Sequence, residues 1–267
     1  MTMAQTYESL RIEKDGPIAL VTFDRPPVNA MSRKSMLEIA AAFNSFKDDK
    51  DTRVAILTAA GERAFMAGVD LNERMDLEHV PDAPAPGMLD SGRIPRECFW
   101  AVYDCAVPVV GAINGPALGA GLAVASMCDI LIASEKARFG LPEIDVGLLG
   151  GGTHLFRLVG SPYKLRRMMF TGQRIDGHEM MRYGAVEAVV PPDQLIPAAR
   201  ALAAEIAMKS PIAVRLAKES LNRTEFMELK EAYRTEQDYT NRLRPFEDSR
   251  EAAAAWLEKR EANFRWR

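Results

Sequence analysis

The sequence predicts an α/β domain, and three continuous apolar segments carry most of that prediction. Residues 54–59 (VAILTA), 107–114 (VPVVGAIN) and 129–133 (DILIA) have the length and composition of buried strands. Helical patterns alternate with them, which is typical of a sheet covered by helices. With 267 residues, 48% of them hydrophobic, the chain is long enough for one large domain or one domain with an appendage.

The N-terminal part is predicted to form a hairpin followed by a helix. Residues 10–13 and 18–23 alternate between apolar and polar, and Asp15-Gly16 between them is typical of a tight turn. The helix is predicted from apolar residues that recur at spacings of three and four, namely Met36, Ile39, Phe43 and Phe46.

The remaining segments predict a long loop and a helical C-terminus. Residues 80–95 are rich in proline and glycine and have no period, so we expect a mobile loop inside the domain. After about residue 192 the pattern is almost wholly helical, with charged faces. We therefore expect a core over residues 1–195 and a helical region over residues 196–267 that contributes to an oligomer contact.

Composition argues against several classes of protein. The net charge of −3 gives no general attraction to nucleic acid, and no apolar run approaches the roughly 20 residues that cross a bilayer. The N-terminus lacks the pattern of a signal peptide, so we expect a cytoplasmic protein. The three cysteines form no CxxC pair and the three histidines are scattered, which predicts reduced thiols and no metal site.

One predicted helix begins with unusually small residues, Gly119, Ala120 and Gly121, in the stretch GPALGAGLAVASMCDI. The first N–H groups of a helix have no partner within the helix, and the helix dipole makes that end electropositive. Small residues there allow either close packing against another segment or the approach of an oxygen that acquires negative charge.

A second small-residue stretch, GERAFMAGVDLNE at residues 61–73, follows the predicted strand at 54–59. Alone it is compatible with a surface turn. Together with the helix start it could supply the second N–H of an oxyanion hole, which requires two amides that converge on one oxygen.

Glu143 is the main candidate for acid–base chemistry. It follows Pro142 in an apolar neighbourhood, where loss of hydration raises a carboxyl pKa and suits it to proton transfer. The alternative is a solvated loop carboxylate. The glycines at 150–152 are not a phosphate loop, because no Gly-Lys-Ser/Thr follows.

Taken in order, seven segments resemble the crotonase (enoyl-CoA hydratase/isomerase) superfamily over nearly the whole chain. They are RPPVNAM, AFMAGVDL, PVVGAINGPALGAG, CDILIAS, ARFGLPEIDVGL, MFTGQRI and AAAAWLEKREANF. The resemblance implies a spiral core of ββα units with C-terminal helices that build a homotrimer or a dimer of trimers. It also implies an acyl-coenzyme A substrate whose enolate is held in an oxyanion hole, with coenzyme A as part of the substrate and no other cofactor.

The resemblance assigns roles to individual residues. The oxyanion amides fall on Val69 and Ala120, and the proton carrier on Glu143. The matching substrate- and coenzyme-binding positions are Arg25, Val28, Ala67, Gly68, Asp70, Gly119, Gly121, Lys259 and Phe264. Lys259 and Phe264 match positions that reach the nucleotide of a neighbouring subunit, and a solvated tail with one aromatic anchor is the alternative.

The chain departs from the hydratases of this family at Ala123, where they carry a first glutamate. Standard hydration divides proton transfer between two carboxylates. A single glutamate therefore favours isomerase-type chemistry or a one-base hydratase over two-base hydration. A hydratase-lyase, a dehalogenase, a thioester hydrolase or an acyl-CoA-binding scaffold remain alternatives.

Three residues near the missing glutamate are candidates to replace it, namely Ser126, Asp145 and His154. The run GLLGGGTH is shorter than the usual family pattern, which changes the pocket beside the acyl chain. That run and the loop around residues 78–98 are expected to line the acyl pocket. Neither identifies the acyl group.

Overall fold

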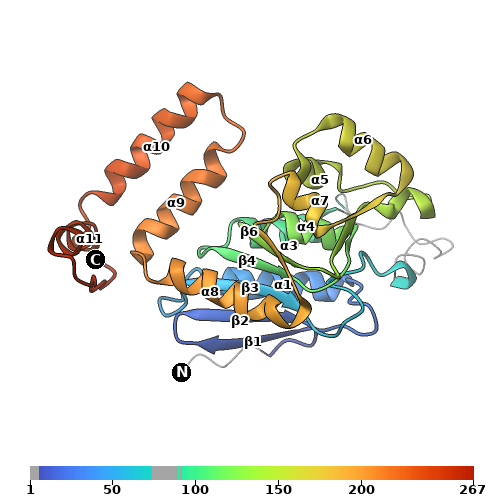
Figure 1. Cartoon of the computed structure of the whole chain (residues 1–267), viewed down its shortest axis with the longest axis horizontal. Coiled ribbons are helices and arrows are strands. Elements are labelled where there is room, and N and C mark those ends of the chain that lie inside the picture. Colours follow the sequence, from blue (N-terminus) through green and yellow to red (C-terminus); the bar gives the residue numbers. More distant parts are fainter. Residues whose placement is uncertain (1–5, 74–89, 91) are drawn as a thin grey trace.

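A six-stranded sheet forms the centre of the computed structural model, which describes residues 6–73, 90 and 92–267 (Figure 1). The strands pair in the order β1-β2-β3-β4-β6-β9. The first pair is antiparallel and the other pairs are parallel. Their bounds are β1 Leu10–Asp15, β2 Ile18–Phe23, β3 Val54–Ala59, β4 Val109–Ile113, β6 Ile130–Ser134 and β9 Ala188–Val190.

Both faces of this sheet are covered, which explains why its central strands are apolar at every position. In β3, Val54 and Ile56 pack with α8 (Leu195–Ala207), whereas Ala55 and Leu57 belong to the larger core on the other face. Side chains alternate between the two faces of a strand, so a strand buried on both sides needs apolar residues throughout.

The larger core lies under the helices that precede and follow β4. These are α1 (Arg33–Ser45), α3 (Arg93–Tyr103) and α4 (Ala120–Ser126). Ser32 caps α1, because its hydroxyl accepts a hydrogen bond from the Ser35 amide at 3.1 Å. Phe43 of α1 is fully buried.

A second, three-stranded sheet lies beside the start of α4. It has the order β5 (Ala117–Leu118), β7 (Arg138–Gly140) and β8 (Arg174–Asp176). The elements around it are the 3-10 helix η1 (Pro142–Val146), α5 (Gly152–Val159), α6 (Pro162–Thr171) and α7 (Gly177–Arg182). The 3-10 helix η2 (Pro192–Gln194) follows β9 and leads into α8.

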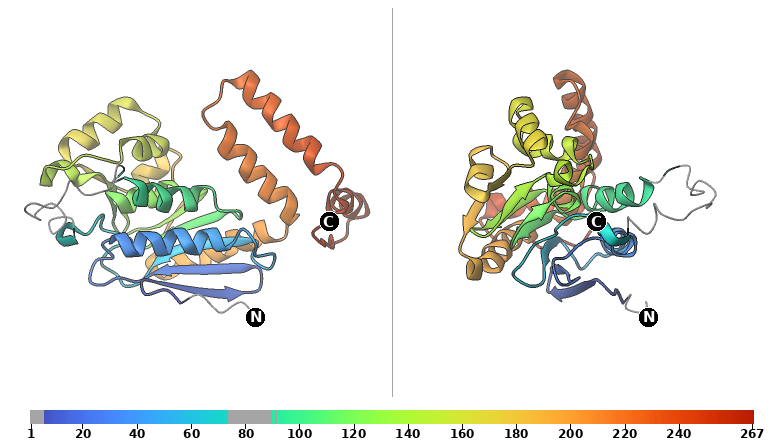
Figure 2. Two further views of the ribbon diagram at one scale, coloured as in Figure 1. Left: turned by 180° about the vertical axis from the view of Figure 1, so that it is seen from behind. Right: turned by 90° about the vertical axis from the view of Figure 1, so that its right-hand side faces the viewer.

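The last three helices project from this body. Helices α9 (Pro211–Thr224) and α10 (Leu229–Leu243) form an antiparallel pair, and α11 (Glu247–Glu258) lies at the end of the pair opposite the turn between them (Figures 1 and 2). The tail folds back on α11, since Asp248 accepts hydrogen bonds from the amides of Arg265 and Trp266 at 2.8 and 2.9 Å. Trp266 also lies under the guanidinium of Arg215, 4.9 Å from it.

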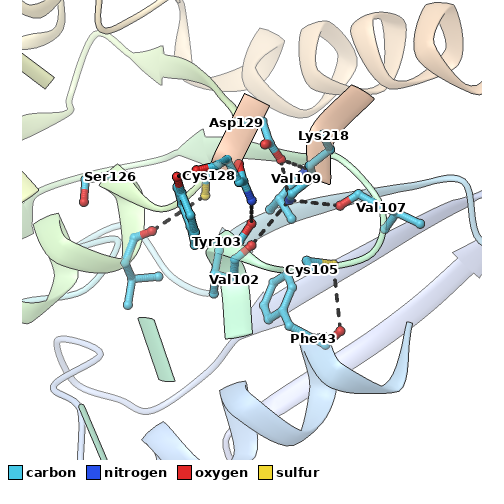
Figure 3. Close-up of polar contacts among 12 residues, drawn as sticks. Phe43, Val102, Tyr103, Cys105, Val107, Val109, Ser126, Cys128, Asp129 and Lys218 are labelled. Carbon is cyan, nitrogen blue, oxygen red and sulfur yellow. Dashed lines mark hydrogen bonds and ion pairs between the residues drawn. The ribbon is translucent and has the colours of Figure 1, made fainter. Parts of the chain in front are cut away.

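An ion pair between a buried lysine and a partly exposed aspartate fixes α9 to the central sheet (Figure 3). Lys218 of α9, 5% exposed, donates to the Asp129 carboxylate at 2.7 Å and to the Val107 carbonyl at 3.2 Å. The same carboxylate oxygen accepts from the Val109 amide at 2.7 Å. A charge removed from water in this way is stabilised only while its partners remain in place.

The structure confirms the predicted α/β class, the hairpin, the first helix and the three apolar strands, with strand ends shifted by a residue or two. Most of the predicted loop at 80–95 lies outside the described residues, but its last part is helical: α3 begins at Arg93. Pro95 is tolerated there because the first turn of a helix has no intrahelical acceptor for its N–H groups.

The expected boundary between residues 195 and 196 falls at the start of α8. That helix packs on the sheet with the core, and the projecting part begins at α9. In the described part of the chain, no helix is long and apolar enough to cross a membrane.

Candidate active site

A cavity of about 400 Å³ lies where five distant segments meet. Its wall includes residues 67–69, two residues of α3, the N-terminus of α4, the continuous stretch from η1 through the glycine run to α5, and one residue of β8. The two small-residue stretches and Glu143, which lie far apart in the sequence, therefore line one cavity.

The segment that carries Val69 is held between two neighbours. On one side the Met31 amide donates to the Gly68 carbonyl at 2.8 Å and the Asp70 amide donates to the Met31 carbonyl at 2.9 Å. On the other side the Leu118 amide donates to the Met66 carbonyl at 3.0 Å. Successive groups of an extended backbone point to opposite sides, so the Val69 N–H points away from Met31.

Ala120 supplies the second free amide. It is the first residue of α4, where no preceding turn provides an acceptor. The neighbouring Gly119 amide is occupied, since it donates to the Gly140 carbonyl at 3.1 Å. Among the residues that the structure describes, neither the Val69 nor the Ala120 amide has an acceptor within the protein.

Glu143 lies on η1, directly beside the start of α4. A Cβ atom added to Gly119 would lie 2.9 Å from Glu143 Oε1 and 3.6 Å from the Gly68 Cα. The other carboxylate oxygen, Oε2, is buried and has no hydrogen-bond partner in the described part of the chain. Burial raises the pKa of Glu143 above its ordinary value.

The two glycines that flank Ala120 have different roles. Gly119 has φ +55° and ψ −121°, a conformation that L side chains rarely adopt, and it lines the cavity. Gly121 is buried, does not line the cavity, and would place a Cβ 2.1 Å from the Met66 carbonyl oxygen. Close packing alone explains the glycine at position 121.

The three candidates to replace the glutamate that is missing at position 123 differ in whether they reach the cavity. Ser126 is fully buried and its hydroxyl donates to the Ala123 carbonyl at 2.7 Å, so it does not face the cavity. Asp145 and His154 both line the cavity, as does Ala123. Ala123 presents only a methyl group to it.

This arrangement matches the requirements of thioester chemistry. Two unoccupied amides can donate to a carbonyl oxygen that becomes negative, and a desolvated carboxylate beside them can move a proton. A model of the enoyl-CoA hydratase/isomerase family matches residues 13–267.

The chain belongs to the enoyl-CoA hydratase/isomerase family.

Individual relatives agree with this assignment. The chain is 41% identical over 226 residues to a (7aS)-7a-methyl-1,5-dioxo-2,3,5,6,7,7a-hexahydro-1H-indene-carboxyl-CoA hydrolase of Rhodococcus jostii, covering 85% of each chain. It is 34% identical over 253 residues to a short-chain-enoyl-CoA hydratase of Clostridium acetobutylicum, covering 93% of this chain and 94% of that one. The structure of Pseudomonas aeruginosa DspI matches with a TM-score of 0.89 and 33% identity over 99% of each chain.

These comparisons confirm the crotonase fold that the sequence predicted and identify the protein as an enzyme of the enoyl-CoA hydratase/isomerase family that acts on acyl-CoA. They do not assign individual residues, so the roles given to Glu143, Val69 and Ala120 rest on the geometry of the cavity.

The residues that were predicted to bind the coenzyme fall into two groups, those that line the cavity and those that do not. Ala67, Gly68 and Gly119 line the cavity. Arg25 does not: it pairs with Asp70 at 2.6 Å and donates to the Ala30 carbonyl at 2.7 Å, which ties the 25–31 loop to the 67–73 loop.

The other predicted coenzyme contacts lie away from the cavity wall. Val28 is half-buried in the 25–31 loop. Lys259 is the C-cap of α11 and Phe264 lies in the tail that follows, and neither lines the cavity of the same subunit. A role for them at a neighbouring subunit's nucleotide stays a prediction.

Among the cavity residues that were not predicted from the sequence, two carry side chains large enough to shape the site. Phe99 lies on α3, and Arg174 is the first residue of β8. Arg174 occurs in the MFTGQRI segment, but nothing in that segment indicates which of its side chains reaches the cavity. Across residues 6–73, 90 and 92–267, no cluster of three or more His, Cys, Asp or Glu is placed to hold a metal ion.

Proposed function

We propose that this protein acts on an acyl-CoA thioester with one carboxylate, Glu143, beside an oxyanion hole formed by the amides of Val69 and Ala120. The observation that carries the proposal is the buried, unpartnered Oε2 of Glu143 in the same cavity as both amides. A buried carboxylate oxygen without a partner is costly to retain unless a ligand or proton uses it.

The proposed reaction begins when the thioester oxygen accepts hydrogen bonds from the two amides. Glu143 then removes a proton from the acyl chain, and the electron pair of that C–H bond moves into an enolate stabilised by the amides. Returning the same proton to another carbon shifts a double bond, which a single carboxylate can accomplish. Coenzyme A enters as part of the substrate, and the reaction needs no further cofactor.

A methyl group at position 123 supports one-base chemistry over standard hydration. Ala123 lines the cavity on α4 and offers no proton. Asp145 is the only other carboxylate of the described cavity wall, and it lies on the same 3-10 helix as Glu143. We therefore place double-bond migration or one-base hydration ahead of a two-carboxylate mechanism.

Hydrolysis is a second candidate, favoured by the 41% identity to a CoA hydrolase whose acyl group carries two oxo groups. In this version Glu143 takes a proton from water, and the hydroxide adds to a carbonyl carbon of the acyl group. The carbon–carbon bond breaks, its electron pair forms the thioester enolate, and the protonated Glu143 returns the proton to the α carbon.

Turnover of three thioester classes by wild type and Glu143→Gln tests the proposal. A 3-enoyl-CoA reports isomerisation, a 2-enoyl-CoA reports hydration, and a cyclic oxo-acyl-CoA in H₂¹⁸O reports hydrolysis by label in the new carboxylate. We expect the variant to lose about 10²–10⁴-fold in kcat on the productive class. Asp145→Asn, which removes a carboxylate from the same helix, is expected to lose less than tenfold.

Two outcomes contradict this function. If Glu143→Gln retains wild-type kcat, Glu143 is not the proton carrier. If wild type binds acyl-CoA but turns over none of the three classes, the protein is an acyl-CoA-binding scaffold.

We also propose that the enzyme forms trimers through its projecting helices. Large apolar side chains on that part are exposed in a single chain, among them Phe226 (80%), Leu229 (83%) and Trp256 (84%). Exposed apolar residues gathered on one projecting element are typical of a subunit interface. Light scattering behind size exclusion tests this, and a monomer at micromolar concentration would contradict it.

A further inference from the structure

His154 occupies a defined position in the cavity wall. It lies in the first turn of α5, is half-buried, and lines the same cavity as Glu143. Its ring meets the ring of Phe99 edge to face, with centroids 5.1 Å apart and an interplanar angle of 75°. Such a contact restricts the orientation of the imidazole.

The polar atoms of this imidazole have no partner in the described part of the protein. No hydrogen bond or ion pair of the His154 side chain occurs there. Burial, together with the charge of nearby Arg157, lowers the pKa of His154 below its ordinary value. The ring is therefore neutral near pH 7 and offers one N–H donor and one acceptor nitrogen.

A second donor lines the same cavity. Arg174 of β8 is exposed, lines the cavity, and likewise has no hydrogen-bond or ion-pair partner in the described part of the chain. Two donors favour an acceptor on the ligand, such as a carbonyl oxygen. Asp145 also lines the cavity, and its carboxylate would repel an anionic substituent.

The rest of the wall is apolar enough to hold a carbon skeleton. Leu71, Pro95, Phe99 and Leu149 contribute to it. An acyl group that fills the cavity displaces the water around His154. A purely hydrocarbon group would then leave the imidazole without a hydrogen bond, which is unfavourable for a desolvated polar group.

We propose that His154 selects the acyl group by hydrogen bonding to a neutral oxo substituent, so that the enzyme takes oxo-acyl-CoA thioesters in preference to hydrocarbon ones. This inference rests on the proposed function only in placing the acyl chain in this cavity. His154 acts here as a specificity-determining residue, and Glu143 remains the proton carrier.

Equilibrium binding of unreactive thioesters tests the selection apart from catalysis. Hexanoyl-CoA is compared with 4-oxohexanoyl-CoA and 5-oxohexanoyl-CoA by calorimetry. We expect wild type to bind at least one oxo thioester about tenfold more tightly than hexanoyl-CoA, which is the effect of one satisfied polar group. His154→Phe should reduce that ratio to below threefold, and His154→Gln should retain part of it.

Two control variants test whether the change in the binding ratio is specific to His154. Thr153→Val changes the neighbouring exposed residue of α5, which does not line the cavity, and should leave the ratio unchanged. Glu143→Gln should also keep the ratio, because binding through His154 does not require the base. Loss of turnover in Glu143→Gln therefore reports on the proposed function alone.

The inference is overturned if wild type binds both oxo thioesters within threefold of hexanoyl-CoA. It is also overturned if His154→Phe, shown to be folded by circular dichroism, keeps the wild-type ratio. A third contrary result is an equal loss of kcat by His154→Phe on oxo and hydrocarbon substrates, because that outcome identifies His154 as a proton-transfer group instead.

Discussion

Gly119→Ala tests how closely the Glu143 carboxylate approaches the start of α4. It should lower both the turnover rate and the stability of the fold. The added Cβ lies 2.9 Å from Glu143 Oε1, which is closer than atoms in ordinary contact, so the carboxylate must retreat. Displacement of a reacting group by about 1 Å costs on the order of 10²-fold in rate. We therefore expect kcat to fall about 10- to 100-fold, with KM changing less than threefold.

The same substitution strains the backbone. Gly119 has φ +55° and ψ −121°, and holding an L-residue in such a region costs about 1–3 kcal/mol of folding free energy. Urea unfolding measures this loss, and steady-state turnover of whichever of the three thioester classes wild type converts measures kcat.

Gly16→Ala is the matched control for strain. Gly16 also has φ +55°, but a Cβ there meets no atom within 4 Å. It lies in the turn between β1 and β2, so we expect a loss of about 1 kcal/mol of stability and an unchanged kcat. A Gly119→Ala enzyme with kcat within twofold of wild type would refute the close approach of Glu143 to this glycine.

Four further predictions concern charged and thiol groups in the interior. Lys218→Met should lower the free energy of unfolding in urea by about 1–3 kcal/mol by leaving the Asp129 carboxylate and the Val107 carbonyl without their shared donor, and adding Asp129→Asn should recover part of that loss; a neutral single variant would contradict this role of Lys218. Because Glu143 must ionise to act as a base, kcat/KM should fall with decreasing pH through a pKa above the ordinary 4.5, and this limb should vanish in Glu143→Gln. The same raised pKa means that ionised Glu143 destabilises the folded state. Glu143→Gln should therefore be more stable than wild type at pH 7 but not at pH 4. The reverse order of stabilities would contradict the raised pKa. Burial raises the pKa of Cys98 and that of Cys128, the latter to about 12. Both thiols should therefore resist a disulfide reagent at pH 8 until urea unfolds the chain. Rapid labelling of the native protein would refute their burial.

The sequence was sufficient for the class of fold and for the segments that meet at the cavity. Continuous apolar strands require cover on both faces, and the small-residue stretches with Glu143 indicated where backbone and base could converge. The sequence could not distinguish Gly119 from Gly121, because both are small residues at one helix start. Their difference depends on what lies opposite: the Glu143 carboxylate for one and the Met66 carbonyl for the other.

The remaining candidates depend on side-chain directions that spacing does not encode. Ser126 is on the same helix as Ala123, yet its hydroxyl bonds within that helix. Arg174 is distant in sequence from the other cavity residues and reaches them only because β8 pairs with β7. Such contacts follow from the pairing of short strands, which the apolar pattern alone does not determine.

The shortness of α4 has a mechanical consequence. Its seven residues span about 10 Å, with the amide of Ala120 at one end. Just beyond its other end, the guanidinium of Arg157 donates to the Ser126 carbonyl, and Asp129 binds Lys218 of the projecting helices. One short helix thus connects the cavity wall to the contacts that hold α9, so we expect a shift of α9 to change the position of the Ala120 amide.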